Sequence, residues 1–515
     1  DGYPRSVFIL QLLLIPAWMA GARLVLRWAR ERNVHNQSAH GHCASAVIVG
    51  NIEQVDQLIR SIKNQISDIG DFAGIVTDEV AAHGLTVRGV KVYGSVDKVG
   101  EVARNAVAGS ILILPPYTRP KEMNNIMEIC DNEKIRCSYR MIPSFTELAS
   151  GILQLSSIRK VEIEDLLGRP TVSFDRDWVK KTVENKVVMI TGAGGSIGSE
   201  LARQLSHYKP KRLVLFEHSE FNLYKIDMEL RATWPDTDFV SVAGSIEQRE
   251  QVNAALVTNK VEIVYHAAAY KHVPLMEVNV CACVQNNTIG SSIVADESEK
   301  AGVERFVLVS SDKAVRPTSV MGASKRLAER VIMERPKSKT RFVAVRFGNV
   351  LGSSGSVIPL FRKQIEKGGP VTVTGPNVTR SFMTIPEAVD LLLQASVIGD
   401  DREIMILEMG EPIKISAMAR RLIKLSGLRP DEDIEIVYTG LRPGEKEYEE
   451  LLTDEDNVVR TPFDRIFALK ANHAQTSGPP DLIEINRLIV KGDAVGMRSF
   501  LCETISDASR CIAEI

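Results

Sequence analysis

The sequence predicts an α/β fold that contains two doubly wound, Rossmann-like parallel sheets. Short β-rich segments alternate with helical segments from residue 46 to about residue 143, and the same alternation starts again at residue 187. Alternation of this kind is typical of strand–helix–strand units, which build parallel sheets. The length of 515 residues agrees with this, because domains of roughly 150 residues give a chain of this size about three domains.

The order of these patterns divides the chain into five segments. They are a membrane-associated helix (1–32), a Rossmann-like domain that lacks the glycines of a nucleotide site (44–150), a linker (151–180), a catalytic domain with a substrate-binding carboxyl-terminal part (181–470) and a helical tail (471–515).

The first segment has the pattern of a membrane helix. Apolar residues run from Val7 to Ala22, interrupted by Gln11 and Pro16, and continue to Trp28. A spanning helix needs about 20 residues. Arginines gather on the carboxyl side of the run, which predicts that the following residues lie in the cytoplasm and disfavours a secretory signal peptide. An interfacial amphipathic helix is the alternative.

Composition excludes several classes of protein. Lys plus Arg number 63 against 65 for Asp plus Glu, a formal charge of −2, so there is no electrostatic reason to expect a nucleic-acid partner. The content of 44% hydrophobic and 25% charged residues is that of a globular chain. Seven cysteines without a CxxC pair fit neither a disulfide scaffold nor a zinc ribbon. His266 and His272 have no metal-ligand spacing with other His or Cys residues, so we predict no metal.

The first sheet lacks the features of a nucleotide site. Its first strand ends at Gly50, and residues 51–54 follow where a phosphate-binding turn would need further glycines. We expect this half to be a non-catalytic regulatory or scaffolding domain. A ligand site on this domain stays an alternative.

The second sheet begins with a glycine-rich turn between a β-branched strand and a helix. It contains Gly192, Gly195, Ser196, Ile197 and Gly198. Glycines at this spacing let the backbone turn tightly and bring its amides onto a pyrophosphate at the amino end of the helix. The turn therefore predicts a dinucleotide site.

Two later features refine this site. Glu217 ends the next strand about 20 residues on, where a carboxylate accepts hydrogen bonds from a ribose 2′-hydroxyl and repels a 2′-phosphate, so NAD is preferred to NADP. Small side chains at Ala267, Ala268 and Ala269 let a ring or ribose lie against the backbone.

A dense polar cluster follows the strand at residues 305–309. It places Ser311, Asp312 and Lys313 at the carboxyl end of a parallel strand, where open α/β sheets bind their ligands. Lys325 comes four residues after Met321, so both side chains share one face of a helix.

These motifs resemble those of the extended short-chain dehydrogenase/reductases, in which a YxxxK pair serves hydride transfer; here Met321 stands in place of the tyrosine. The segments SDKAV, MGASK, FGNVLGSSGSVIPLF, TIPEAV and GLRPGEK are similar to those of membrane-anchored bacterial UDP-N-acetylglucosamine 4,6-dehydratases of surface-polysaccharide synthesis. The resemblance covers nearly the whole chain and implies a lyase at the bacterial inner membrane.

The resemblance also implies an internal redox reaction and a role for each residue. NAD⁺ takes a hydride from sugar carbon 4, water is eliminated across carbons 5 and 6, and the hydride returns to carbon 6. Asp312 would protonate the leaving hydroxyl and Lys313 would remove the carbon 5 proton, which requires a raised and a lowered pKa respectively. Ser311 or a water chain would take the proton of the carbon 4 hydroxyl, because Met321 cannot, and Lys325 would hold the nicotinamide ribose.

Further residues are candidates for the sugar and its diphosphate. By resemblance, Lys271, His272 and Glu277 lie beside the sugar, and the amide of Asn349 suits sugar or phosphate oxygens. Three basic residues nearer the carboxyl terminus could meet a diphosphate: Arg380, Arg442 and Lys446.

Two other functions stay open at this point. A UDP-sugar 4-epimerase or reductase has the same fold and cofactor but depends on the tyrosine that is missing here. A non-catalytic nucleotide-sugar-binding protein is the other alternative. We expect a UDP-sugar, the membrane and further copies of the chain as partners.

Overall fold

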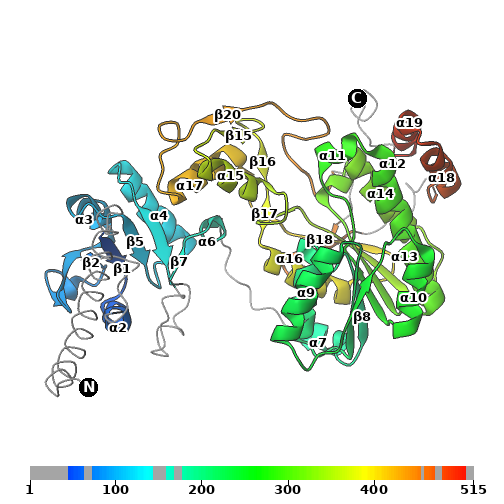
Figure 1. Ribbon diagram of the computed structural model, residues 1–515, viewed down its shortest axis with the longest axis horizontal. Coiled ribbons are helices and arrows are strands. Elements are labelled where there is room, and N and C mark those ends of the chain that lie inside the picture. Colours follow the sequence, from blue (N-terminus) through cyan, green and yellow to red (C-terminus); the bar gives the residue numbers. More distant parts are fainter. Residues whose placement is uncertain are drawn as a thin grey trace, which may run out of the picture. The chain divides into compact units, whose positions relative to one another are not determined.

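The computed structural model describes residues 45–62, 72–142, 158–167, 177–453, 458–469 and 478–505. It contains two compact units, residues 1–169 with 425–428 and residues 170–424 with 429–515 (Figure 1). The predicted membrane helix at 1–32 lies outside the described residues. Within the described ranges, no helix has the length and apolar character needed to span a bilayer.

The first unit is built on a seven-stranded sheet. In spatial order the strands are β3 (Thr86–Val87), β4 (Val90–Gly94), β2 (Phe72–Val76), β1 (Ala46–Val49), β5 (Ser110–Ile113), β6 (Ser138–Met141) and β7 (Arg159–Lys160). The five central strands are parallel, and the short edge strands β3 and β7 are antiparallel. All five strands that the sequence predicts for this half are confirmed.

Helices connect these strands, and the strands β1 and β5 at the middle of the sheet are fully buried. The helices are α2 (Ile52–Ile62), α3 (Val99–Asn105), α4 (Pro120–Asn132) and α6 (Ile163–Leu167). Strand β1 is buried along its whole length, as expected for a strand of a parallel sheet covered on both faces. Strand β7 and helix α6 lie in the segment that we predicted to be a linker, and they belong to the first unit.

The second unit contains a nine-stranded sheet. Its spatial order is β10 (Phe239–Ala243), β9 (Arg212–Glu217), β8 (Val187–Thr191), β11 (Ile263–His266), β12 (Arg305–Val309), β13 (Arg341–Arg346), β18 (Glu403–Leu407), β22 (Ile466–Leu469) and β21 (Val458–Arg460). The first seven strands are parallel and the last two are antiparallel additions. The chain reverses its direction of winding between β8 and β11, and ligands of open α/β sheets bind at such a switch point.

Helices cover both faces of this sheet (Figure 1). One face packs against α7 (Asp177–Val183), α8 (Ser196–Ser206), α9 (Glu220–Thr233) and α16 (Ile385–Ile398). The other packs against α10 (Arg249–Asn259), α12 (Val280–Val284), α13 (Ser291–Ala301) and α14 (Val320–Met333). The predicted helical tail forms α18 (Leu482–Lys491) and α19 (Ala494–Thr504), whose Leu488 and Leu501 join this second core.

Short strand pairs and two helices follow the carboxyl ends of the sheet. They are β14 (Asn349–Val350) with β17 (Phe382–Met383), β15 (Val371–Val373) with β20 (Ile436–Tyr438), β16 (Thr379–Arg380) with β19 (Ile413–Lys414), and the helices α15 (Val357–Glu366) and α17 (Ile415–Leu425). This part supplies the second wall of the cavity described below.

Candidate functional site

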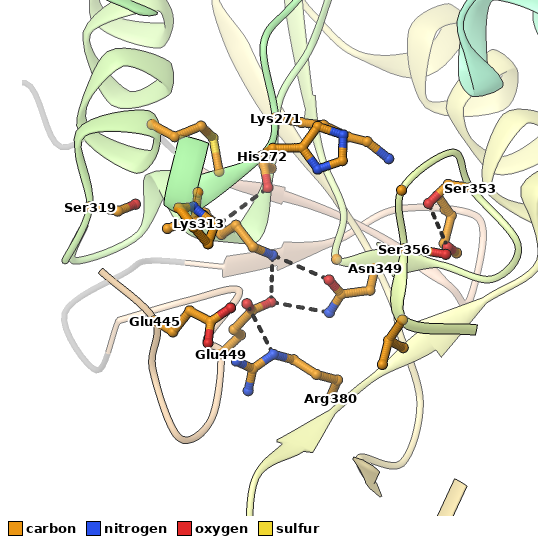
Figure 2. Close-up of a pocket in the computed structure, with 18 of the residues that line it drawn as sticks. Lys271, His272, Lys313, Ser319, Asn349, Ser353, Ser356, Arg380, Glu445 and Glu449 are labelled. Carbon is orange, nitrogen blue, oxygen red and sulfur yellow. Dashed lines mark hydrogen bonds and ion pairs between the residues drawn. The ribbon is translucent and has the colours of Figure 1, made fainter. Parts of the chain in front are cut away.

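A cavity of about 1070 Å³ lies at the carboxyl ends of the parallel strands in the second unit. Its walls come from the glycine turn after β8, the segments after β11, β12 and β13, and residues 372–382 and 439–449. A pocket of this size holds a large ligand or two adjacent ones. Eighteen of its lining residues are drawn in Figure 2.

The glycine turn is packed so closely that side chains do not fit. Gly192 has φ +67°, and a Cβ there would lie 2.8 Å from the Cα atom of Ala268. A Cβ on Gly198 would lie 2.0 Å from the carbonyl oxygen of Gly192. Helix α8 starts at Ser196 without a side-chain cap on its amides, and residues 194–198 line the cavity. The turn thus offers uncapped backbone amides to an anion, which fits the pyrophosphate of a dinucleotide.

Glu217 holds the glycine turn in place by a hydrogen bond from the turn's backbone. Its side chain is buried, Oε2 accepts a hydrogen bond from the Gly194 amide at 3.0 Å, and Oε1 accepts one from the Ser219 amide at 3.0 Å. An ionised carboxylate has about four acceptor positions, so these bonds leave capacity for a ribose hydroxyl. Glu217 is not among the cavity-lining residues, and its predicted contact with the ribose stays a prediction.

Lys325 and Met321 lie on the cavity face of α14. The Lys325 ammonium donates to the Val309 carbonyl at 2.8 Å, and burial lowers its pKa to about 8. Met321 is buried one turn earlier and also lines the cavity. Of the alanine triplet, Ala267 and Ala269 line the cavity while Ala268 packs against Gly192.

The predicted catalytic cluster lies where β12 ends. Ser311 accepts a hydrogen bond from the Lys313 amide at 3.3 Å and donates one to Asp312 Oδ1 at 2.8 Å. Asp312 is held by its own amide, which donates to the Phe347 carbonyl at 3.1 Å. Burial, together with the negative charge of Glu449, raises the pKa of Asp312 to about 7. This is the direction that a general acid needs.

Sequence reasoning missed Glu449, which contacts three of the predicted residues. Its carboxylate accepts from Lys313 Nζ at 2.7 Å, from Asn349 Nδ2 at 3.1 Å and from Arg380 Nε at 3.2 Å (Figure 2). Only 10% of the side chain is exposed. Burial alone would raise its pKa, but the charge of Lys313, a hydrogen bond with Asp312 and the charge of Arg380 together outweigh burial, and the pKa lies below its usual range. The acidic run that follows GLRPGEK was its only signal in the sequence.

Glu449 also corrects the expectation for Lys313. A lysine that acts as a base needs a lowered pKa, and burial acts in that direction. The Lys313 ammonium lies 3.1 Å from Asp312 and 2.7 Å from Glu449, and these two carboxyls raise its pKa instead. In this arrangement Lys313 is a charged ammonium.

The predicted sugar contacts divide into two groups. Lys271, His272 and Asn349 line the cavity, and burial lowers the pKa of both Lys271 and His272. Glu277 does not line it, which differs from our expectation. Its buried carboxylate accepts from the Val320 amide at 2.8 Å and from Arg498 at 3.0 Å, so it holds the start of α14 to the tail.

The predicted diphosphate cations line the cavity but already have partners. Arg380 donates to the Lys446 carbonyl at 2.7 Å and to the Glu447 carbonyl at 3.0 Å, so it anchors the segment that carries Glu449. Arg442 is exposed and pairs with Glu445. Lys446 Nζ donates to the Val315 carbonyl at 3.0 Å. Desolvation by the surrounding wall lowers the pKa of Lys446, and it also lowers the pKa of Lys271.

The part of the chain with described positions contains no group of three or more His, Cys, Asp or Glu side chains arranged to hold a metal ion. Among these described residues we therefore identify no ligand set for a metal.

Comparison with known families places both units. A family model described as polysaccharide biosynthesis protein matches residues 188–471, and a model described as CoA-binding domain matches residues 1–143.

Several relatives match long stretches of the chain. The capsular polysaccharide biosynthesis protein CapD of Staphylococcus aureus is 41% identical over 470 residues, 90% of this chain and 77% of that protein. A UDP-N-acetylglucosamine 4,6-dehydratase (inverting) of Campylobacter jejuni is 29% identical over 316 residues, 60% of this chain and 90% of that protein. A UDP-glucose 4-epimerase of Rickettsia canadensis is 32% identical over 280 residues, 53% of this chain and 79% of that protein.

Among solved structures, Pen from Bacillus thuringiensis is similar with a TM-score of 0.53 and 32% identity. The match covers 60% of this chain and 99% of Pen.

Proposed function

The chain belongs to the polysaccharide biosynthesis protein family, and we propose that it is an NAD-dependent nucleotide-sugar 4,6-dehydratase that acts on UDP-N-acetylglucosamine. The observation that carries this proposal is the pairing of Met321 with Asp312 in one cavity. Epimerases and reductases of this fold use a tyrosine where Met321 stands, whereas elimination of water requires an acid such as Asp312 near the leaving hydroxyl.

NAD is the cofactor, and when bound it would supply the hydride acceptor for carbon 4 of the sugar and the hydride donor for carbon 6. The chain's own residues bind and orient it. Amides of residues 194–198 bind the pyrophosphate, and Glu217 fixes the turn that presents them. Lys325, whose ammonium is held by the Val309 carbonyl, lies on the cavity wall and binds the ribose hydroxyls of the nicotinamide half.

Asp312 supplies the proton for the hydroxyl that leaves carbon 6. Its raised pKa keeps it protonated at and below about pH 7. Ser311 lies beside it and takes the proton of the carbon 4 hydroxyl, directly or through water, because Met321 has no group that accepts a proton. Lys313 faces the proton on carbon 5, which becomes acidic once carbon 4 is a ketone.

A UDP-sugar is the substrate class that these residues favour. Cations on the cavity wall, Lys271 and Lys446 among them, would balance the charge of a diphosphate, and Asn349 and His272 provide polar contacts for a sugar. Similarity to the UDP-N-acetylglucosamine 4,6-dehydratase of Campylobacter jejuni adds support for UDP-N-acetylglucosamine as the substrate.

Mass spectrometry of the nucleotide sugar tests this proposal. The purified full chain is incubated with UDP-N-acetylglucosamine and no added cofactor. Loss of one water with UDP retained is the expected result. The galacto isomer at unchanged mass would select the 4-epimerase, which the Rickettsia relative favours. No change, even with added NAD, would favour another sugar or a nucleotide-sugar-binding protein.

We also propose attachment to the bacterial inner membrane, with both units in the cytoplasm. The apolar run from Val7 and the arginines after it support this. Fractionation of cells that express the full chain should find it in the membrane pellet after a high-salt wash, and recovery in the supernatant would contradict it. Assembly into a homo-oligomer stays a prediction, which light scattering of the purified chain would check.

A further inference from the structure

We propose that Glu449 is a positioning residue of the elimination, which accepts a proton from Lys313 and so converts Lys313 into the amine that removes the carbon 5 proton. This inference rests on the proposed function. It concerns a residue that the sequence analysis did not single out and whose carboxylate contacts three residues of the cavity wall, Lys313, Asn349 and Arg380.

The need for such a residue follows from Lys313. An ammonium cannot take a proton, and Lys313 lies between two carboxyls that favour its charged form. A base must therefore be generated within the site. The hydrogen bond from Lys313 Nζ to Glu449 Oε2 is 2.7 Å long, which provides a direct path for the proton.

The charges around Glu449 identify it as the ionised member of the group. Lys313, Arg380 and the Asn349 amide all donate to it. Asp312 faces the same Lys313 ammonium, and Lys446 and Lys271 are further basic residues of this wall. The negative charge of Glu449 acts on Asp312 and holds a proton there. Before reaction the three groups are thus a carboxylic acid, an ammonium and a carboxylate.

The protons balance over one turnover. The Lys313 proton passes to Glu449 Oε2, and the free amine takes the proton from carbon 5. As the C5–H bond breaks, its electron pair forms the double bond to carbon 6, and the C6–O bond breaks while Asp312 protonates the leaving oxygen to give water. The proton on Glu449 then returns through Lys313 to Asp312, whose Oδ1 lies 3.1 Å from Nζ. The hydride returns to carbon 6 as carbon 5 takes up a proton from water, which balances the proton that the carbon 4 hydroxyl released, and the starting state of the three groups is restored.

Glu449→Gln is the main test because glutamine keeps the size and an acceptor oxygen but loses the charge. Its kcat should fall about 100-fold or more, the lower end of what general acid–base groups contribute, with KM changed less than about threefold. A carbon 5-deuterated substrate should show a larger isotope effect on kcat than in the wild type. The alkaline limb of the pH profile should move to lower pH, because the charge that holds the proton on Asp312 is gone.

Two further variants control for structure. Glu449→Asp keeps the charge and should retain the wild-type shape of the pH profile at reduced kcat. Glu450→Gln removes the neighbouring carboxylate, which pairs with Arg316 and does not line the cavity, and should match the wild type. Wild-type kcat and profile in Glu449→Gln would overturn the proposal, as would equal loss in the Gln and Asp variants with an unchanged profile.

A measurement without substrate separates this inference from the proposed function. Infrared difference spectra of the full chain, followed through about pH 5 to 9, should show the C=O band of a buried carboxylic acid. Asp312→Asn should remove this band, and Glu449→Gln should shift the midpoint of its titration to lower pH. An unchanged titration midpoint in Glu449→Gln would overturn the coupling between Glu449 and Asp312 even if the wild type dehydrates the sugar. A wild type that does not dehydrate the sugar, but shows this shift, would overturn only the proposed function.

Discussion

The two units follow one architectural plan but differ at the carboxyl ends of their strands. In the first unit, Gly50 follows β1. A Cβ at this position would lie 2.8 Å from the Leu114 side chain, so the packing there requires glycine. In the second unit, Gly192 and Gly198 make room for the backbone of the turn itself, which brings amides to the cavity. The same residue type thus serves the packing of the core in one unit and ligand binding in the other.

The acidic residues after the strands differ in the same way. Asp78 follows β2, and its carboxylate accepts from the Val96 amide and the Tyr117 hydroxyl, both at 3.1 Å. These bonds hold loops of the first unit together. Asp312 follows β12 and lines a cavity, next to a lysine and a second carboxyl. A parallel sheet therefore offers an edge for a site, and the loop residues decide whether a site forms there.

The strongest test of this contrast exchanges the two acids for amides. Asp312→Asn should lower dehydratase kcat about 100- to 10,000-fold, because asparagine cannot donate the proton that the leaving hydroxyl needs. Asp78→Asn should leave kcat unchanged, since its contacts lie within the first unit. Lys313→Ala should resemble Asp312→Asn. Steady-state kinetics with bound NAD quantified would check this, and full turnover in both cavity variants would contradict the assigned roles.

Buried and exposed ion pairs give the next test. Arg346 donates two hydrogen bonds of 2.7 Å to Glu329, and their side chains are 2% and 1% exposed. Glu329→Gln removes the charge that balances Arg346, which should cost about 3–5 kcal/mol in the second unit. Asp56→Asn breaks the exposed pair with Arg88 in the first unit and should leave stability close to wild type.

Hydrogen exchange resolved by peptide would measure these two variants, with β13 reporting on the second unit and β1 on the first. Equal protection in β13 of the wild type and Glu329→Gln would show that this buried pair contributes little.

Substitution of the two strand-end glycines should separate cofactor binding from packing. Gly198→Ala places a Cβ 2.0 Å from a backbone oxygen, so the turn must shift and NAD affinity should fall at least about tenfold, or about 1.4 kcal/mol. Gly50→Ala meets a side chain instead and should lower only the stability of the first unit. Calorimetric titration with NAD checks both, and unaltered affinity in Gly198→Ala would contradict the site.

The pH dependence of the wild type gives the smallest of these effects. Because the pKa of Asp312 is raised to about 7, the acid is protonated below that pH and ionised above it. Activity should therefore fall as pH rises through about 7, by up to about tenfold for each further unit. A profile of kcat that stays flat to about pH 9 would show that Asp312 does not act as the acid.

Much of the fold was accessible from the sequence. The strands at residues 46–49 and 187–191 were predicted because β-branched runs alternate with helical segments, and this pattern depends on local residue order. Strand β18 was missed, and the segments 159–160 and 163–167 were interpreted as linker. Strand β7 and helix α6 are too short to show a local period, and β18 pairs with β13, which is distant in the sequence.

The candidate site was predictable to a similar extent. The glycine turn and the residues Asp312 and Lys313 follow strands closely, so strand prediction places them on the cavity edge, and the spacing from Met321 places Lys325 on one face of a helix. Glu277 was misjudged because its partner Arg498 is more than 200 residues away in the chain. Glu449 was missed for a similar reason, because it is separated from Lys313 by 136 positions in the sequence.

The sequence by itself determined the alternation of strands and helices, the glycine turn and the identity of the groups after β12, because each depends on neighbouring residues. Only the tertiary structure decided the protonation of those groups. The pKa of a side chain depends on burial and on charges within a few ångströms, wherever they lie in the chain. Folding buries Asp312 and brings Glu449 close to it, which raises the pKa of Asp312. Asp312 and Glu449 together raise the pKa of Lys313.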